Sequence, residues 1–385
     1  MTPPDPAARR PPRAVMAALQ ASFARPFDNP LDDAAFDRLA RDIFAWQFGR
    51  NDPFAAYCTR RGRTPDRVMH WSEIPAVPTA AFREVALIAG RREDAEAVFR
   101  TSGTTKGGER RGEHYIADIA VYDNALLAAF AAMLLPDGVR PMMISLVPPP
   151  RDLPDSSLGH MIATVMAGLG SPDSRTCASV AHGMDTAALD DALRQARQSG
   201  EPACLLGTSF SFVHWLDALA AGGRTCRLPD GSRLMDTGGF KGRSREVDAD
   251  AMRAAYLERF AIAPDFAINE YGMTELCSQF YDTTLRERVL GGRPGLRRKQ
   301  APPWVRTRVV DPATLEPLPH GRQGLLQHFD LANAGSVIAV QTEDIGVIVD
   351  GGFRVIGRAH GATPRGCSIA MDDLLTAVRE RAPRR

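Results

Sequence analysis

The sequence predicts an α/β protein with mostly parallel sheets flanked by helices and a smaller β subdomain. Between Met142 and Asn269, short apolar runs alternate with amphipathic runs of helical spacing. After Trp304, short strand patterns are separated by turn residues. With 385 residues and 44% apolar content, the chain is long enough to bury a large core.

The N-terminal part of the chain is predicted to be helical after a disordered start. Residues 1–13 are rich in Pro and Arg, which is typical of a disordered tail. The helical pattern is clearest from Leu31 to Phe48, where apolar residues recur every three or four positions. The stretch Ile74 to Phe82 carries two prolines, so it belongs at a sheet edge or outside a sheet. We expect a helical region over residues 14–98.

Residues 99–300 carry the alternation that predicts the parallel sheet and form the expected nucleotide-binding core. A long helix is expected from Ile116 to Leu135, ended by Pro-Asp-Gly. Strands and helices then alternate in this order: Met142 to Val147 (strand), Leu158 to Leu169 (helix), Ala203 to Leu206 (strand), Phe210 to Ala221 (helix), Arg233 to Asp236 (strand), Ala249 to Phe260 (helix) and Phe266 to Asn269 (strand). Such alternation favours a mostly parallel sheet with helices on both faces.

The last part of the chain is predicted to be antiparallel β structure followed by a short tail. In TEDIGVIVDGGFRVIGR, residues 342–358, two strand patterns flank an Asp-Gly-Gly turn. We expect a small β subdomain over residues 301–358, which completes a large domain spanning residues 14–358. Residues 359–385 form a short C-terminal tail that contains Cys367.

Charge and composition exclude several classes of partner. The 47 basic and 46 acidic residues leave a net charge of +1, which offers no field for nucleic acid or an anionic membrane. The longest apolar run, Ala125 to Leu135, is too short to cross a bilayer, and the N-terminus lacks the apolar stretch of a signal peptide. We expect a cytoplasmic protein.

The six cysteines predict neither a zinc site nor a disulfide framework. They include no C-x-x-C pair and no nearby histidine at ligand spacing. We expect reduced thiols.

Two short segments have residue types suited to binding a nucleotide. The first is TSGTT, whose hydroxyls, backbone N–H groups and glycine suit phosphate oxygens. It comprises Thr101, Ser102, Gly103, Thr104 and Thr105. The second is YGMTE, residues 271–275, which supplies an aromatic face, a hydroxyl and a carboxylate for adenine, phosphate and Mg²⁺. Runs of this kind are most often surface loops when they occur alone, so their joint occurrence carries the hypothesis.

These segments resemble the adenylate-forming superfamily, whose members activate carboxylic acids with ATP and release pyrophosphate. The resemblance implies that the TSGTT loop wraps the triphosphate of ATP. It also implies the adenylate-forming large-domain fold. Site roles follow in the same way: Tyr271 and Gly272 at adenine, Thr274 at the phosphate, Glu275 at Mg²⁺, Asp344 at the ribose hydroxyls, and Gly357 and Arg358 at the hinge.

A glycine pair after a predicted strand is similar to the adenine-binding loop of that superfamily. The pair is Gly238 and Gly239, in the segment DTGGFKG. From the residues alone, these glycines predict a turn.

The chain departs from the superfamily at its C-terminus and at one lysine. Most members carry a further small domain there that delivers a catalytic lysine, but only 27 residues (385 − 358) follow Arg358 here. Another cation is needed to offset charge on the leaving pyrophosphate. Lys241 and Lys106 are the candidates, and an ordinary surface role stays open for each. The superfamily usually has glycine at the position of Lys106.

Four further features resemble the acyl-protein synthetase (LuxE) family of bacterial light-emission operons. They are the tail GATPRGCSIAMDDLL, the segments DTGGFKG and FDLAN, and the total length. The resemblance implies that the chain activates a fatty acid, passes the acyl group to its own Cys367 and delivers it to a partner such as an acyl reductase.

The residues around Cys367 independently suggest a reactive thiol. Arg365 and Gly366 precede it, and an amphipathic run follows, so the thiol would lie at a helix N-terminus beside a cation. Both features favour the thiolate, although Asp372 and Asp373 in the expected first turn oppose it. The alternative is a small buried apolar residue, the commoner role of a lone cysteine.

Two other functions remain compatible with the sequence. The chain could deliver the acyl group to coenzyme A or to another soluble thiol or amine, which would leave Cys367 uninvolved. It could also be a binding subunit that keeps the nucleotide site without turnover, since the lysine domain is missing. The motifs do not identify the acid, the final acceptor or the oligomeric state.

Overall fold

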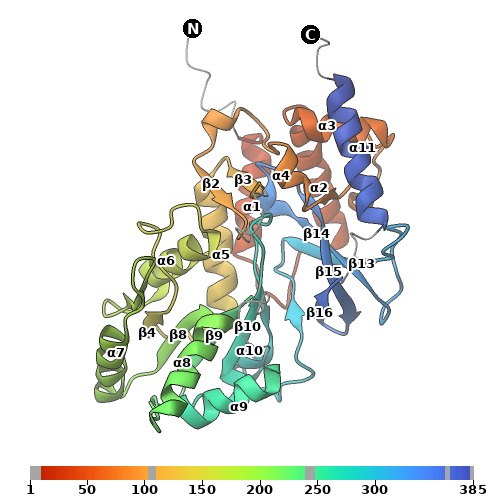
Figure 1. The fold of residues 1–385 in the computed structure, drawn as a ribbon. Coiled ribbons are helices and arrows are strands. Elements are labelled where there is room, and N and C mark those ends of the chain that lie inside the picture. Colours follow the sequence, from red (N-terminus) through yellow and green to blue (C-terminus); the bar gives the residue numbers. More distant parts are fainter. Residues whose placement is uncertain (1–9, 103–109, 239–247, 360–364, 382–385) are drawn as a thin grey trace. The chain divides into compact units, whose positions relative to one another are not determined.

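The computed structural model describes residues 10–102, 110–238, 248–359 and 365–381 (Figure 1). The chain divides into two compact units. The first comprises Met1–Ala125, Met273–Gln279 and Gln300–Arg385, and the second comprises Leu126–Gly272 and Phe280–Lys299. The first unit is therefore built from three separate stretches of sequence.

Helices of the first unit come mainly from the two ends of the chain. They are α1 (Arg13–Phe23), α2 (Asp33–Phe48), α3 (Asp52–Arg60), α4 (Ala81–Glu84) and α11 (Arg365–Arg381), with the 3₁₀ turns η2 (Trp71–Glu73), η3 (Arg92–Asp94) and η5 (Leu331–Asn333). Helix α5 (Ile119–Leu134) continues from the first unit into the second. Side-chain caps begin two of the helices: Asp32 accepts from the N–H of Ala35, and Asn51 from that of Phe54.

The β structure of the first unit is mostly antiparallel. Its strands are β1 (Val77–Pro78), β2 (Ala97–Arg100), β3 (Glu113–Ile116), β13 (Val305–Val310), β14 (Gln323–Asp330), β15 (Ala339–Val349) and β16 (Gly352–Arg358). Strands β13, β14, β15 and β16 pair in chain order, and β1 joins β15 in parallel. Strands β2 and β3 form a separate antiparallel pair. The strands after Trp304 are antiparallel, as the sequence predicts.

The second unit contains the parallel sheet. Its strands are β4 (Met142–Ser145), β5 (Arg175–Thr176), β8 (Ala203–Thr208), β9 (Arg233–Thr237), β10 (Ala267–Tyr271) and β11 (Phe280–Asp282), with the small pair β6 (Ala178–Ser179) and β7 (Gly183–Met184). The parallel order is β5-β4-β8-β9-β10, and β11 is antiparallel to β10. Strand β12 (Lys299–Gln300) contains the last residue of the second unit and the first of the next stretch.

Helices connect the parallel strands and confirm the predicted α/β class. They are α6 (Ser157–Leu169), α7 (Thr186–Ser199), α8 (Ser209–Ala221), α9 (Ala249–Phe260) and α10 (Thr284–Val289), with the 3₁₀ turn η4 (Pro264–Phe266). The expected helices and strands of this region are all present, with ends shifted by a few residues. Helix α7 was not predicted.

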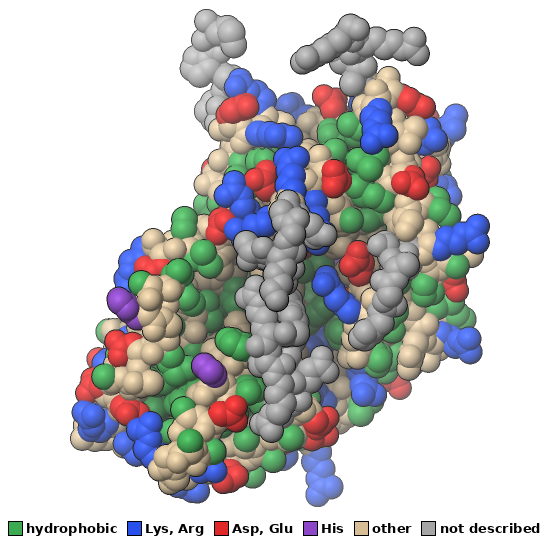
Figure 2. Space-filling view, viewed as in Figure 1, with side chains coloured by type: hydrophobic (Ala, Val, Ile, Leu, Met, Phe, Trp, Pro, Cys, Tyr) green, Lys and Arg blue, Asp and Glu red, His purple; other side chains and the backbone are tan. Residues whose placement is uncertain are grey.

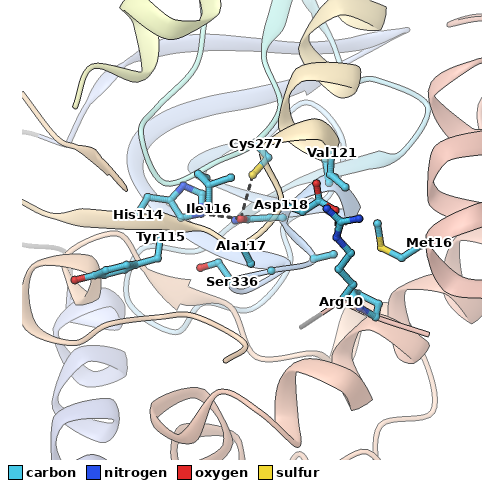
Figure 3. A pocket seen from close by; sticks show the side chains of 15 residues that line it. Arg10, Met16, His114, Tyr115, Ile116, Ala117, Asp118, Val121, Cys277 and Ser336 are labelled. Atoms are coloured by element: carbon cyan, nitrogen blue, oxygen red, sulfur yellow. Dashed lines mark hydrogen bonds and ion pairs between the residues drawn. The ribbon is translucent and has the colours of Figure 1, made fainter. Parts of the chain in front are cut away.

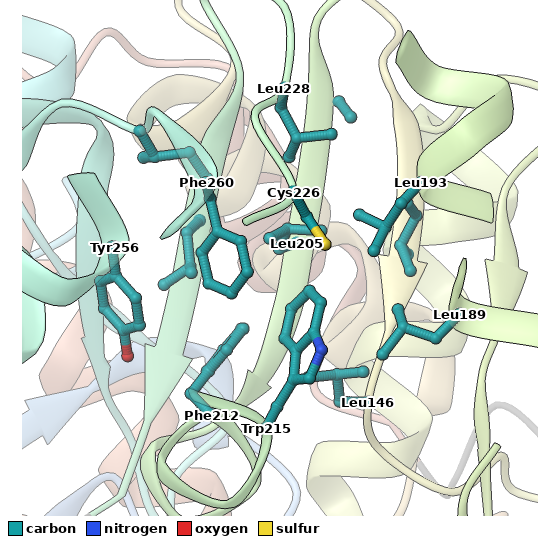
Figure 4. Close-up of a cluster of buried hydrophobic side chains, with 14 of the residues drawn as sticks. Leu146, Leu189, Leu193, Leu205, Phe212, Trp215, Cys226, Leu228, Tyr256 and Phe260 are labelled. Atoms are coloured by element: carbon teal, nitrogen blue, oxygen red, sulfur yellow. The ribbon is translucent and has the colours of Figure 1, made fainter. Parts of the chain in front are cut away.

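An aromatic cluster forms the centre of the second unit (Figure 4). The rings of Trp215 and Phe260 stack with centroids 4.4 Å apart, and those of Phe212 and Tyr256 meet edge to face at 5.5 Å. Helices α8 and α9 supply all four rings, so burying them fixes these helices on their strands.

The C-terminal segment contains a 17-residue helix that packs on helix α3. Asp373 of α11 lies 3.1 Å from Nη2 of Arg61, and the same carboxylate reaches Arg60. Because α11 begins at Arg365, Asp372 and Asp373 lie beyond its first turn. The sequence expectation that placed these aspartates in the first turn is wrong.

Surface charge agrees with the balanced composition. Figure 2 shows basic and acidic side chains interspersed over the face in view. Over the residues that the structure describes, no helix has both the length and the apolar character that spanning a membrane requires.

Candidate active site

Two buried side chains of the first unit, His114 and Asn333, hold the main chain of the YGMTE segment. Figure 3 shows His114 where it lines a small pocket. Nδ1 of His114, on strand β3, lies 2.7 Å from the carbonyl oxygen of Thr274. The side-chain N–H of Asn333 donates to the carbonyl of Glu275 at 3.0 Å. Nε2 of His114 is in turn 2.9 Å from Oδ1 of Asn333. Strand β3 and turn η5 therefore fix the backbone on which the predicted phosphate and metal ligands are carried.

A buried carboxylate continues this network. Asp330 accepts hydrogen bonds from the N–H of Cys277 at 3.0 Å and from the hydroxyl of Ser278 at 2.8 Å. The indole N–H of Trp304 donates to the same hydroxyl. Burial raises the pKa of Asp330 to about 6. The FDLAN segment, which the sequence identified only by resemblance, thus acts as a support for YGMTE.

The environment of His114 keeps its ring neutral. Burial is the largest influence and lowers its pKa to about 4. The hydrogen bonds with Thr274 and Asn333 act in the opposite direction. A neutral ring carries one N–H, so only one of the two oxygens can accept from it. A cavity of about 20 Å³ adjoins His114, Cys277 and Asn333, room for about one water molecule. His114 lies within a short strand pattern, but nothing in its local sequence marks it as a support for YGMTE.

Glu275 is the carboxylate that the sequence predicts as a magnesium ligand. It is buried, and Thr274 beside it is half-buried. Within the described ranges, no group of three or more His, Cys, Asp or Glu side chains could hold a metal ion. A single carboxylate together with nucleotide phosphates is the usual way in which proteins bind Mg²⁺. A carboxylate at this position is of the type that suits magnesium arriving with ATP, and Glu275 as its protein ligand stays a prediction.

Only the first two residues of the TSGTT loop lie in the described part of the structure. The hydroxyl of Thr101 accepts from the N–H of Gly112 at 2.9 Å, and its carbonyl accepts from Nε of Arg111 at 2.6 Å. These bonds fix where the loop leaves strand β2. Ser102 follows, whereas Gly103, Thr104, Thr105 and Lys106 lie outside the described residues.

The predicted ribose and hinge residues are neighbours on the β15–β16 hairpin. Asp344 lies directly opposite Arg358 in the antiparallel register, and their side chains form an ion pair at 3.5 Å. The hydroxyl of Thr342 accepts from the N–H of Asp344 at 3.1 Å. Gly357 lies opposite Ile345, where the register shifts. The carboxylate is mostly buried, while the guanidinium is largely exposed.

The second unit supplies the remaining nucleotide candidates. Gly238 follows β9 with φ of +76°, a conformation that favours glycine, and no atom of the described residues lies within 4 Å of where its Cβ would be. Tyr271 ends strand β10, with its ring centroid 5.8 Å from that of Phe280. Gly272 follows it. Gly239 and Lys241 lie outside the described residues.

Buried polar groups surround the ends of strands β9 and β10. Asp236 accepts from the amide of Asn269 at 2.7 Å and from the hydroxyl of Tyr256 at 2.8 Å. Thr237 hydrogen-bonds to Glu270. Burial raises the pKa of Glu270 to about 7, so this carboxyl is partly protonated near neutral pH. The sequence alone did not point to Asp236 and Glu270 as part of the site, although Asp236 begins the DTGGFKG segment and Glu270 directly precedes YGMTE.

The boundary between the two units falls inside the YGMTE segment. Tyr271 and Gly272 belong to the second unit with Gly238, whereas Thr274 and Glu275 belong to the first. The first unit also contains Thr101, Ser102, Asp344, Gly357, Arg358 and Cys367. The convergence of these two groups on one ATP molecule stays a prediction.

Cys367 is the third residue of helix α11 and is buried against strand β15. Its Sγ lies 4.0 Å from the carbonyl oxygen of Thr342, and the side chain packs in a small cluster with Val310 and Leu325. Burial, with a smaller contribution from Glu343, raises the pKa of the thiol to about 11. The expectation of a favoured thiolate is wrong for this conformation, because burial outweighs the helix N-terminus.

Comparison with known proteins places the chain in a family. The family model described as acyl-protein synthetase, LuxE, matches residues 156–376, more than half of the chain. The chain belongs to the LuxE acyl-protein synthetase family. Two relatives have the name long-chain-fatty-acid–luciferin-component ligase. The one from Vibrio harveyi is 24% identical over 356 residues, and the one from Aliivibrio fischeri is 22% identical over 353, with 88% of both chains covered in each case.

Solved structures show the same fold. An open conformation of 2-hydroxyisobutyryl-CoA ligase gives a TM-score of 0.62 at 15% identity, covering 86% of this chain and 71% of that one. The same ligase in its postadenylation state gives 0.61 at 14% identity, with 85% and 67% covered. The adenylate-forming fold predicted from the sequence is confirmed. As a LuxE-family member, the chain is an AMP-forming acyl ligase that uses ATP.

Proposed function

We propose that this enzyme activates a fatty acid as its acyl adenylate and transfers the acyl group to Cys367. A carboxylate oxygen of the acid attacks the α-phosphorus of ATP, the bond to the pyrophosphate oxygen breaks, and pyrophosphate leaves. The sulfur of Cys367 then forms a bond to the acyl carbon while the mixed-anhydride C–O bond breaks. AMP leaves, and the thiol proton passes to solvent.

The main support for this proposal is the position of Cys367 beside strand β15 in the first unit. Its sulfur contacts the carbonyl of Thr342 on strand β15, two residues before Asp344, the predicted ribose ligand. Asp344 in turn pairs with Arg358. A candidate acceptor and a candidate nucleotide ligand therefore share one strand and its immediate neighbours. The names of the two relatives, which specify long-chain fatty acids, support the choice of substrate.

The nucleotide roles are part of the proposal. Loop residues 101–105 would hold the triphosphate, Tyr271 and the glycines at 238 and 239 would hold adenine, and Asp344 would bind the ribose hydroxyls. Thr274 would contact the phosphate, and Glu275 would bind Mg²⁺, which neutralises phosphate charge when bound. Each group is of the type that its ligand requires.

Mass spectrometry of the intact protein tests the transfer to Cys367. After incubation with ATP, Mg²⁺ and a long-chain fatty acid, the parent gains the mass of one acyl group and Cys367→Ser does not. Both proteins exchange labelled pyrophosphate into ATP when the acid is present. Cys58→Ser serves as a matched control, because Cys58 is also buried and belongs to the same unit. An acylated Cys367→Ser protein would refute the assignment.

The buried state of Cys367 favours a second candidate, in which the acyl group goes to coenzyme A or to another soluble thiol or amine. In that case the parent would release pyrophosphate and make soluble acyl product while its own mass stays unchanged. Absence of pyrophosphate exchange over a broad panel of acids would instead leave a nucleotide-binding subunit without turnover.

Lys241 and Lys106 are proposed as alternative sources of the positive charge at the departing pyrophosphate. Methionine substitution at the residue that acts in this way should lower pyrophosphate exchange by about a hundredfold, the typical effect of losing one such stabilising group. The other substitution should leave the exchange nearly unchanged. Equal, small effects would exclude both lysines.

Delivery to an acyl reductase is the proposed last step. Mixing acylated enzyme with such a reductase and its reduced nicotinamide cofactor should release a fatty aldehyde and regenerate the free thiol. A thioester that persists under these conditions would exclude this type of acceptor.

A further inference from the structure

A cavity of about 210 Å³ lies beside Cys367 in the first unit. Three segments form its walls: the turn that follows strand β1, strand β15 and the first turns of helix α11. The lining residues are Pro78, Thr79, Ala80, Gln341, Glu343, Cys367, Ser368, Met371 and Asp372. The thiol is therefore both buried in the protein and part of a cavity wall.

The chemistry of the lining suits an uncharged, apolar occupant. Its aliphatic surface comes from Pro78, Ala80 and Met371. Among its nine described lining residues, the only charged side chains are two acids, the half-buried Glu343 and the exposed Asp372, and none is basic. A phosphate or carboxylate would meet repulsion here and no cation to pair with. The cavity is thus unsuited to the pyrophosphate of coenzyme A or to a free fatty-acid headgroup.

The surroundings of the sulfur favour its neutral forms. Burial and the nearby Glu343 carboxylate disfavour a thiolate, whereas a thioester carries no charge and escapes both penalties. The conformation described is therefore better suited to holding an acylated sulfur than to attacking an adenylate. An apolar chain attached to that sulfur would also be removed from water.

We propose that this cavity stores the acyl chain while it is bound as a thioester to Cys367. The inference rests on the proposed function, because it needs Cys367 to carry the acyl group. An apolar cavity of about 150 Å³ accommodates benzene, so about 210 Å³ accommodates roughly eight acyl carbons. The thioester and the first part of a long chain are sheltered, and the remaining carbons extend past the cavity.

The lifetime of the isolated acyl-enzyme tests this proposal. The protein is acylated with saturated acids of about four to sixteen carbons, freed of ATP, and followed by intact mass as the thioester hydrolyses. The half-life should rise by up to about fourfold for each added carbon, the factor expected for one more sheltered methylene. It should level off near eight carbons. A half-life that does not depend on chain length would overturn the proposal.

Two substitutions should shift, in opposite directions, the chain length at which the half-life levels off, which we call the plateau. Ala80→Leu fills part of the cavity and should bring the plateau to shorter chains, whereas Met371→Ala enlarges the cavity and should extend it. Ile369→Ala is the matched control, because Ile369 lies on the same helix, is 46% exposed and does not line the cavity. Identical plateaus in all three variants would refute the assignment.

The outcomes separate this inference from the proposed function. If the parent protein is never acylated at Cys367, the proposed function fails first. If it is acylated but the half-life of the thioester does not depend on chain length, only the storage role fails. Thermal melting of each variant shows whether it is folded, and the chain-length series on the parent protein decides the question without any variant.

Discussion

The sulfur of Cys367 and the carbonyl oxygen of Thr342 lie 4.0 Å apart, which joins the start of helix α11 to strand β15. The next residue along that strand, Glu343, is the charged group that acts on the thiol, and Asp344 comes after it. One short stretch of strand therefore touches the proposed acyl acceptor and carries the proposed ribose ligand.

Glu343→Gln should make Cys367 more reactive. Its carboxylate contributes to the raised pKa of the thiol, but burial is the larger cause and is unchanged by the substitution. We expect the rate of alkylation by iodoacetamide at pH 8 to rise by about two- to threefold, because loss of one nearby charge at a partly exposed site shifts a pKa only modestly. Mass spectrometry of the alkylated Cys367 peptide measures this rate. Glu380→Gln, an exposed change on the same helix, should have no effect on it.

Asn333→Ala should weaken both the fold and the adenylation step. The substitution leaves the carbonyl of Glu275 without its donor in a buried place, at a cost of about 1–3 kcal/mol in the free energy of unfolding. Because the backbone of Thr274 and Glu275 loses its support, pyrophosphate exchange should fall by about tenfold or more at saturating ATP.

The matched control for this change is Asn29→Ala. Asn29 accepts a hydrogen bond from Arg25 at an exposed position, so its loss should change neither quantity measurably. Full pyrophosphate exchange in a folded Asn333→Ala protein would show that the network has no role in positioning the segment.

Glu270→Gln should alter how stability depends on pH. The native carboxyl has a pKa of about 7 instead of 4.5, so the unfolded state loses this proton first as the pH rises. Glu270 therefore contributes most to the free energy of unfolding of the parent below about pH 4.5. This contribution falls as the pH rises and is lost by about pH 7. Glutamine does not titrate, and the variant should become more stable relative to the parent at pH 8 than at pH 5.

The size of this effect is bounded by the shift in pKa. Between pH 5 and pH 8, the free energy of unfolding of the variant should rise relative to that of the parent by up to about 3 kcal/mol, at 1.36 kcal/mol for each unit of pKa. Urea unfolding at the two pH values measures it. An equal difference between variant and parent at both pH values would mean that Glu270 ionises normally.

Breaking the ion pair between Arg61 and Asp373 should cost little. The pair joins helices α3 and α11 at 3.1 Å, but each side chain is 30% exposed. A double-mutant cycle of Arg61→Ala and Asp373→Ala should give a coupling free energy of about 0.2–1 kcal/mol. A larger value would make this pair, instead of apolar packing, the main attachment of α11.

Much of the fold is encoded in local patterns. The run at Ala249–Phe260 and its neighbours gave helices because apolar residues recur at the spacing of a turn, and the strands of the parallel sheet appeared as short buried runs. Helix α7 was not predicted, although its buried residues Leu189, Leu193 and Ala196 recur at the spacing of a helical turn. Asp185 caps its start and Gly200 follows its end, so the local signals for this helix are present in the sequence.

The candidate site was less accessible to such reasoning. Segments with characteristic residue types, such as YGMTE and FDLAN, could be found. The supporting roles of His114 and Asn333 could not, because their partners lie 160 and 58 residues away in the chain. The charge state of Cys367 was misjudged for the same reason. Its neighbours in sequence favour a thiolate, whereas distant residues bury the sulfur and reverse that preference.

The division of the first unit into three stretches has a consequence for biosynthesis. The second unit is nearly continuous in sequence and can fold while the chain is still leaving the ribosome. The first unit must wait for helix α11, which follows every other described element in the sequence, before α3 gains its packing partner. A message cut short before this helix would yield a protein that lacks Cys367 and leaves an apolar face uncovered, a product that quality-control proteases recognise and remove.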